Sequence, residues 1–148
     1  MTIRIEGTLR RGELGLDLDV EIEAGRTTIV GTNGTGKTTL LRLVAGLEAL
    51  EEGTVHINGR LVDDGGSNFV AAHERPTALV FQEHRLFPHL RAIDNVAFPL
   101  RRNGVHRVDA HERSLAMLGR VGMHELADRR PQQLSNGQQQ RVAIARAL

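Results

Sequence analysis

The chain of 148 residues is long enough for a domain with a hydrophobic core, and its formal net charge of +1 gives no sign of a nucleic-acid-binding surface. It contains no cysteine, which excludes a disulfide framework and thiolate chemistry. The first twenty residues carry seven charged side chains and no apolar run reaches eighteen residues. We therefore predict neither a secretory signal nor a membrane span.

Two strands are predicted at the start of the chain. Residues 3–9 are predicted to be a short strand, and residues 14–22 place an apolar side chain at every second position between acidic ones. A period of two predicts a half-buried antiparallel strand. After the turn at Ala24-Gly25, residues 26–30 are predicted to be a strand that leads into a glycine-rich loop.

That loop has the sequence Val30-Gly31-Thr32-Asn33-Gly34-Thr35-Gly36-Lys37-Thr38-Thr39, which fits G-x-x-x-x-G-K-[ST]. Its glycines let the backbone turn sharply, so that amides and a helix N-terminus point at an anion. Lys37 is the only lysine in the chain, and the hydroxyl of Thr38 is placed to bind Mg²⁺. A chance match is the alternative, but the predicted strand before the loop and the helix over 36–45, stopped by Gly46, favour a phosphate loop.

The remainder of the first ninety residues completes a predicted α/β core. Residues 54–57 and 60–62 are joined by Asn58-Gly59, the strongest short hairpin signal, and a polar loop follows over 63–68. Residues 78–81 form an apolar run, predicted to be a buried strand that ends at Gln82. We assign residues 1–90 to a nucleotide-binding α/β core with antiparallel strands beside it.

Residues 91–148 have helical periodicity and are assigned to a helical region. One helix carries Ile93, Val96 and Ala97 and closes near Pro99, and a second is capped by Asp109 and followed by Gly122. A short helix is predicted over 124–128, and a last one over 136–148 after Ser135.

A second motif, Leu134-Ser135-Asn136-Gly137-Gln138-Gln139-Gln140-Arg141, lies at the start of this last helix. A serine and a glycine at a helix start offer a hydroxyl and exposed amides to another anion. We interpret the two sites as gripping the phosphates of different ATP molecules across a head-to-tail dimer. The alternative is that Gln138 to Gln140 form a plain polar helix face.

Together these segments resemble the ATPase subunits of ABC transporters, with residues 31–38 as Walker A, Gln82 as the Q-loop glutamine and residues 134–138 as the signature motif. The stretch 81–90 and Asp94-Asn95-Val96 resemble the importer group, and molybdate-type ATPases most of all, ahead of the sulfate, thiamine and spermidine types. The resemblance implies an α/β P-loop NTPase core with antiparallel strands beside it and a mainly helical subdomain.

The resemblance also implies roles for individual residues. Lys37 and Gln82 would be catalytic, Gln82 would sense Mg²⁺ and the attacking water, and Thr38 and Gln82 would lie at the metal ion. The phosphates of one ATP would be held by Gly31, Asn33, Gly34, Gly36, Lys37, Thr38 and Thr39, and the site of the other protomer would be completed by Ser135, Gly137 and Gln138.

The implied partners are a second ATPase subunit in a homodimer or pseudo-dimer, integral membrane permease subunits and, indirectly, a periplasmic or surface solute-binding protein, but no nucleic acid. The implied location is the cytoplasmic face of the cell membrane, and the implied solute is molybdate or another oxyanion. Residues 87–90 would lie by the coupling helix of a permease, with a purely structural role in the core as the alternative.

Three departures from the family pattern stand out. Asn136 takes the place of the first signature glycine; asparagine tolerates a positive φ but adds bulk, so we expect function retained with weaker closure. No Tyr or Trp is present and all four Phe follow residue 68, so no aromatic residue precedes Walker A to stack on adenine. The sequence stops at Leu148, before any Walker B motif or catalytic glutamate. We therefore expect the fold to be incomplete at the C-terminus. We also expect no turnover of ATP by these 148 residues.

Two other functions remain open. A soluble ABC-type ATPase acting on DNA or ribosomes usually carries a long insertion between the Q-loop and the signature, whereas only 52 residues separate Gln82 from Ser135 here, which favours an importer. The other is a nucleotide-binding fragment that does not hydrolyse ATP.

Overall fold

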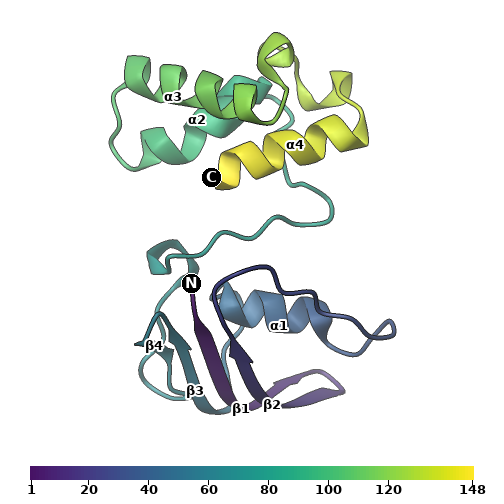
Figure 1. Ribbon diagram of the computed structural model, residues 1–148, viewed down its shortest axis with the longest axis vertical. Helices are drawn as coiled ribbons and strands as arrows, with labels where there is room; N and C mark the ends of the chain where they lie inside the picture. Colours follow the sequence, from purple (N-terminus) through teal and green to yellow (C-terminus); the bar gives the residue numbers. More distant parts are fainter. The chain divides into compact units, whose positions relative to one another are not determined.

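A four-stranded sheet and one α-helix make up the first of the two units into which the chain divides, Met1–Leu79 and Val80–Leu148 (Figure 1). The structure is a computed structural model that describes residues 1–148. Each unit has its own hydrophobic core. Residues 80–90 belong to the second unit by their contacts. The functional division at residue 90 stays a prediction.

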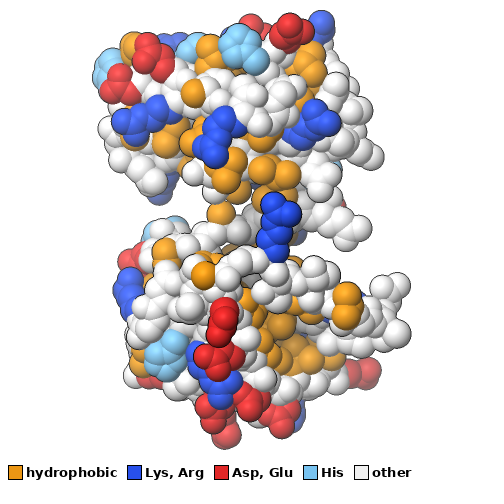
Figure 2. All heavy atoms as spheres, viewed as in Figure 1, with side chains coloured by type: hydrophobic (Ala, Val, Ile, Leu, Met, Phe, Trp, Pro, Cys, Tyr) orange, Lys and Arg blue, Asp and Glu red, His pale blue; other side chains and the backbone are white.

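The strands of the first unit lie in the order β2-β1-β3-β4, and every neighbouring pair is antiparallel. They are β1 (Ile3–Arg11), β2 (Leu14–Ile22), β3 (Glu52–Ile57) and β4 (Arg60–Asp63). The predicted alternation over residues 14–22 is confirmed, because the acidic side chains of β2 are exposed while its apolar ones are partly covered. Acidic side chains gather over the lower part of this unit in the space-filling view (Figure 2).

The hairpin predicted at Asn58-Gly59 is confirmed. These two residues have φ values of 50° and 77°, the left-handed pair that a two-residue type I′ turn requires. The turn joins β3 to β4, and Asn58 also accepts a hydrogen bond from the backbone N–H of Thr2 through its Oδ1 at 2.9 Å. The N-terminus of β1 is thereby tied to the end of the hairpin.

Helix α1 (Lys37–Val44) agrees with the predicted helix to within one residue at each end. Its fully buried Leu43 packs into the core of the first unit, which is formed mainly by β-branched residues of β1, β3 and β4. Gly46 has a φ of 73° and ends the helix as predicted. A Cβ on Gly46 would come within 2.6 Å of Nε of Arg75, so the close approach of that side chain also requires glycine.

The strands predicted over 26–30 and 78–81 are wrong for this structure. Neither segment has strand conformation, Val30 is 84% exposed, and Ala78 and Val80 lie on the surface. A segment becomes a strand only where a neighbouring strand supplies ladder hydrogen bonds. The four strands of this sheet pair only with one another, so neither segment has a partner in it. The apolar residues of these segments predicted strands, but they do not specify a pairing partner.

The second unit consists of α2 (Ala92–Arg102), α3 (Arg107–Arg120) and α4 (Asn136–Ala147), with the 3-10 turns η2 (His124–Leu126) and η3 (Pro131–Gln133) before α4. The helical character predicted after Arg91 is confirmed. Its core combines apolar side chains of all three helices, with Leu118, Met123 and Val142 fully buried. No helix of the structure is long and apolar enough to cross a bilayer.

Three predicted boundaries in this unit were wrong by a few residues. Helix α2 continues to Arg102 instead of closing near Pro99, because an internal proline removes one intrahelical hydrogen bond and the next turn still forms, with Asn103 N–H donating to the carbonyl of Pro99. Helix α3 starts at Arg107, so Asp109 lies in its first turn and His106 is the cap. The short helix predicted over 124–128 is a single 3-10 turn.

Arg75 holds α1 against the rest of the first unit. It is 5% exposed, and its guanidinium donates to carbonyls from three different segments: Leu43 at 2.8 Å, Val70 at 2.7 Å and Val62 at 3.2 Å. Burial lowers the pKa of Arg75, and the charge of Asp63 acts in the opposite direction. The guanidinium stays charged at neutral pH, and it satisfies carbonyls that no water reaches.

We predict that Arg75→Ala destabilises the first unit by about 2–4 kcal/mol, because several buried carbonyls lose their donor at once. Urea unfolding followed by circular dichroism measures the change, with Arg60→Ala, an exposed arginine of the same unit, as the control. A midpoint equal to that of the control would contradict the structural role given to Arg75.

Candidate nucleotide-binding site

The glycine-rich loop that precedes α1 has a backbone that only glycine adopts without strain. Gly34 and Gly36 have φ values of 85° and 89°. A Cβ on Gly36 would also come within 2.7 Å of the side chain of Leu16 on β2. The sheet therefore supports the loop from behind and fixes the start of α1.

Lys37 folds back over this loop. Its Nζ donates to the carbonyl of Gly31 at 2.8 Å and to that of Thr32 at 2.5 Å, while the hydroxyl of Thr35 donates to the same Thr32 carbonyl at 3.0 Å. The ammonium is thus held at the mouth of the loop by neutral acceptors. A phosphate oxygen carries more negative charge than a carbonyl, so it is a stronger partner for this ammonium.

The other predicted phosphate-binding residues surround the same mouth with one exception. Gly31, Asn33, Gly34 and Thr38 are exposed. Thr39 is only 4% exposed and faces the interior behind the helix start. These four residues therefore offer solvent-facing groups to an anion, whereas Thr39 has a packing role in this structure.

A hollow of about 300 Å³ opens beside the loop. Its walls combine Gly31, Gly36 and Lys37 with apolar side chains of β2 and α1, including Leu16 and Leu40. No aromatic side chain lines it, in agreement with the sequence, so any base bound here would rest on aliphatic groups.

The signature segment forms the N-terminus of α4. Ser135 is the cap: its Oγ accepts a hydrogen bond from the backbone N–H of Gln138 at 3.3 Å, and Oε1 of Gln138 accepts from the backbone N–H of Ser135 at 2.9 Å. This capping box uses the lone pairs of the serine and leaves its O–H free to donate. Ser135 can therefore stabilise the helix and bind an anion at the same time.

Asn136 causes no strain at the first signature glycine position. It is the first residue of α4 and has ordinary negative φ, so the left-handed conformation considered from the sequence is not needed. A Cβ on Gly137 would meet nothing within 4 Å. The fold itself therefore requires glycine at neither position.

Gln82 is exposed and begins an irregular segment that runs to α2. Asn95, fully buried on α2, holds the far part of this segment: its Oδ1 accepts from Phe87 N–H at 2.7 Å, and its amide donates to the carbonyls of Phe87 and Leu90 at 3.2 Å. Sequence reasoning noted Asn95 only within a family motif. A polar residue among Ile93, Val96 and other apolar positions was the signal that could have revealed this role.

The structure thus brings the phosphate-loop residues together in the first unit, and it brings Ser135, Gly137 and Gln138 together in the second. Gln82 belongs to the second unit, and its approach to Lys37 stays a prediction. No group of three or more His, Asp or Glu side chains is arranged to hold a metal ion.

A family model described as ABC transporter matches residues 16–148, which is most of the chain. The chain belongs to the ABC transporter family. The resemblance drawn from the Walker A loop, Gln82 and the signature segment is therefore confirmed at the level of the family.

Several curated import proteins are similar to this chain. The Fe(3+) ions import ATP-binding protein of Rhizobium meliloti is 46% identical over 133 residues, covering 89% of this chain and 36% of that protein. The molybdenum import ATP-binding protein of Thiobacillus denitrificans is 45% identical over 135 residues, covering 90% and 36%. The spermidine/putrescine import ATP-binding protein of Hahella chejuensis is 44% identical over 134 residues, covering 90% and 35%. The chain spans about a third of the length of these relatives.

Two solved structures share the fold, each with a TM-score of 0.74 and coverage of 99% of this chain and 68% of the other. One is a dimeric ATP-binding cassette in a post-hydrolysis state with ADP and Pi, 30% identical, and the other a dimeric bacterial ABC transporter cassette, 31% identical. The α/β ABC cassette fold predicted from the sequence is confirmed.

The capping box leads to a prediction for Ser135. Ser135→Ala should destabilise the second unit by about 1 kcal/mol because the N–H of Gln138 loses its acceptor, whereas Ser135→Asp should keep the stability because a carboxylate is an equally good cap. Urea unfolding measures both, with Gln140→Ala on the exposed face of α4 as the control. Equal stability of the alanine variant and the control would show that the box contributes nothing.

Proposed function

We propose that this chain is the ATP-binding subunit of an ABC-type importer, in which ATP binding and hydrolysis drive solute entry through membrane subunits. The observation that carries the proposal is the pair of anion-accepting helix starts: α1 behind a loop closed by Lys37, and α4 behind the free hydroxyl of Ser135. Family membership supports ATP as the ligand.

In this proposal Lys37 exchanges two neutral carbonyls for the β and γ phosphates, while the glycine-rich backbone turns its amides to the same oxygens. Mg²⁺ bound with the nucleotide would neutralise charge on these phosphates. Thr38 and Gln82 fit this role, because both are exposed and Mg²⁺ takes few protein oxygens when phosphates supply the others. Gln82 would also orient the attacking water.

The proposed site is shared between two subunits in head-to-tail arrangement. Ser135, Gly137 and Gln138 of one subunit would close on the nucleotide held by Lys37 of the other. The dimeric state of both similar cassettes supports this arrangement, as does the exposed position of each helix start.

The finer parts of the proposal concern partners and solute. We propose permease subunits in the membrane and a solute-binding protein as partners, and a place at the cytoplasmic face of the membrane. The import proteins among the relatives support this proposal. Molybdate or another oxyanion is the proposed solute, supported by sequence resemblance and by a molybdenum import protein of similar identity to those for iron and polyamines. Loss of molybdate uptake on deletion of the encoding gene would support it, and unchanged uptake would overturn it.

We predict that Lys37→Ala weakens MgATP binding by about 100-fold or more, because the charge that pairs with two phosphates is lost. Titration calorimetry measures the affinity. Arg26→Ala, which removes an exposed positive charge from the same unit, should bind as the parent does. Tight MgATP binding by the lysine variant would refute the nucleotide site.

Mixing two inactive variants tests the shared site. Lys37→Ala and Ser135→Asp chains should each fail to dimerise with MgATP, because one lacks the phosphate charge and the other repels the phosphate. A mixture should recover part of the ATP-dependent dimer seen by analytical ultracentrifugation, since a heterodimer keeps one site with Lys37 and Ser135 both intact. No recovery would mean that both residues serve a nucleotide within one chain.

A further inference from the structure

The segment that follows Gln82 contains a strained turn. His84 and Arg85 have φ values of 57° and 45°, although neither is glycine, and two consecutive left-handed residues of this kind are rare. The turn is closed locally by His84 N–H donating to the carbonyl of Phe81 at 2.9 Å and by Arg85 N–H donating to that of Glu83 at 2.6 Å. Backbone of this kind persists only where its surroundings enforce it.

Arg146, near the end of α4, holds this turn in place. Its guanidinium donates through Nη1 to the carbonyl of Arg85 at 2.8 Å and through Nη2 to that of His84 at 3.0 Å. It also lies over the ring of Phe87, 5.7 Å from the centroid. The two strained residues therefore present their carbonyls to one planar fork from a helix more than sixty residues further along the chain.

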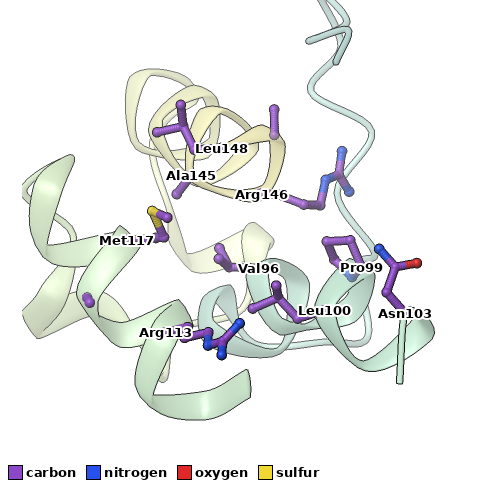
Figure 3. Close-up of a pocket in the computed structure, with 11 residues that line it drawn as sticks. Val96, Pro99, Leu100, Asn103, Arg113, Met117, Ala145, Arg146 and Leu148 are labelled. Atoms are coloured by element: carbon purple, nitrogen blue, oxygen red, sulfur yellow. The ribbon is translucent and has the colours of Figure 1, made fainter. Parts of the chain in front are cut away.

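The surroundings of Arg146 leave the backbone as its principal partner. No carboxylate forms an ion pair with it, and burial lowers its pKa. Figure 3 shows the side chain reaching from α4 toward the coil segment, beside a hollow of about 450 Å³ lined by Val96, Leu100 and Met117.

The far end of the same segment is fixed separately. Asn95 binds the backbone at Phe87 and Leu90, and Leu86 packs against the helical core, so Arg146 supplies the tertiary hydrogen bonds of the part next to Gln82. Ser135 caps the N-terminus of helix α4, and Arg146 lies in its last turn, where it binds the turn at His84 and Arg85. A rigid helix thus connects the signature serine to the turn next to the glutamine.

We propose that Arg146 is a positioning residue that fixes the left-handed turn beside Gln82, so that the glutamine and the signature end of α4 move as one body when the dimer closes on nucleotide. This inference rests on the proposed function for its role in catalysis. Its structural half, enforcement of the turn by the guanidinium, can be tested without nucleotide.

The first measurement is amide hydrogen exchange at His84 and Arg85 in the free chain. Arg146→Ala should speed exchange at these two amides by about tenfold or more, because the turn opens once its anchor is gone. Arg113→Ala, which removes an exposed guanidinium from the same hollow, should leave them unchanged. Arg146→Lys, whose ammonium is not a two-pronged fork, should lie between the two and serves if the alanine variant does not fold.

A second substitution separates positioning from general packing. In the Arg146→Ala background, Arg85→Gly should restore much of the lost protection at His84, because glycine adopts a left-handed φ freely. Unchanged exchange in Arg146→Ala, or loss of protection spread over all of α4 with no rescue by glycine, would overturn the proposal.

The functional half is tested by comparing nucleotide binding with and without Mg²⁺. Arg146→Ala should weaken ATP binding in Mg²⁺ about tenfold while leaving ATP binding in EDTA unchanged, because in the proposed function Gln82 acts at the metal ion and Lys37 at the phosphates. Equal loss in both conditions, or no loss, would overturn the link to Gln82. If the parent chain itself binds no ATP, the proposed function fails, whereas the exchange result still decides whether Arg146 holds the turn.

Discussion

Backbone carbonyls that converge on an arginine guanidinium hold each unit of this protein in shape. In the first unit Arg75 joins α1 to β4 and to the chain at Val70, and in the second Arg146 joins α4 to the turn after Gln82. The carbonyls bound by Arg75 are buried and need a donor, and in both units a planar fork serves several carbonyls at once. Neither arginine belongs to the predicted phosphate-binding set: Arg75 holds the C-terminal end of α1, and Arg146 holds the turn after Gln82.

Two residues of the candidate site also take part in hydrogen bonds that hold the structure together. Lys37 and Ser135 each have a structural partner in this structure, the loop carbonyls for the lysine and the N–H of Gln138 for the serine. In the proposed function, the lysine would exchange its partners for phosphates, whereas the serine would keep its partner and use a free O–H. Binding at the first helix start would then rearrange contacts, and binding at the second would add one.

Local patterns in the sequence were sufficient for β1, β2, the hairpin at Asn58-Gly59, helix α1 and the capped helix α4, because alternation, helical periodicity, turn chemistry and capping act between residues close in the chain. They failed for residues 26–30 and 78–81, whose state depends on a pairing partner. The phosphate loop and the signature segment were found from motifs. The roles of Arg75, Arg146 and Asn95 were not, since each binds backbone of another segment and nothing in the local sequence specifies that partner.

Both candidate phosphate contacts contain an asparagine followed by glycine, Asn33-Gly34 in the loop and Asn136-Gly137 at α4, and all four residues are exposed. Asparagine is a chemically labile residue, and loss of ammonia from its side-chain amide leaves a carboxylate. A new negative charge at either place would repel the triphosphate from the groups that attract it. Slow deamidation of stored protein would then reduce nucleotide affinity well before it affected folding.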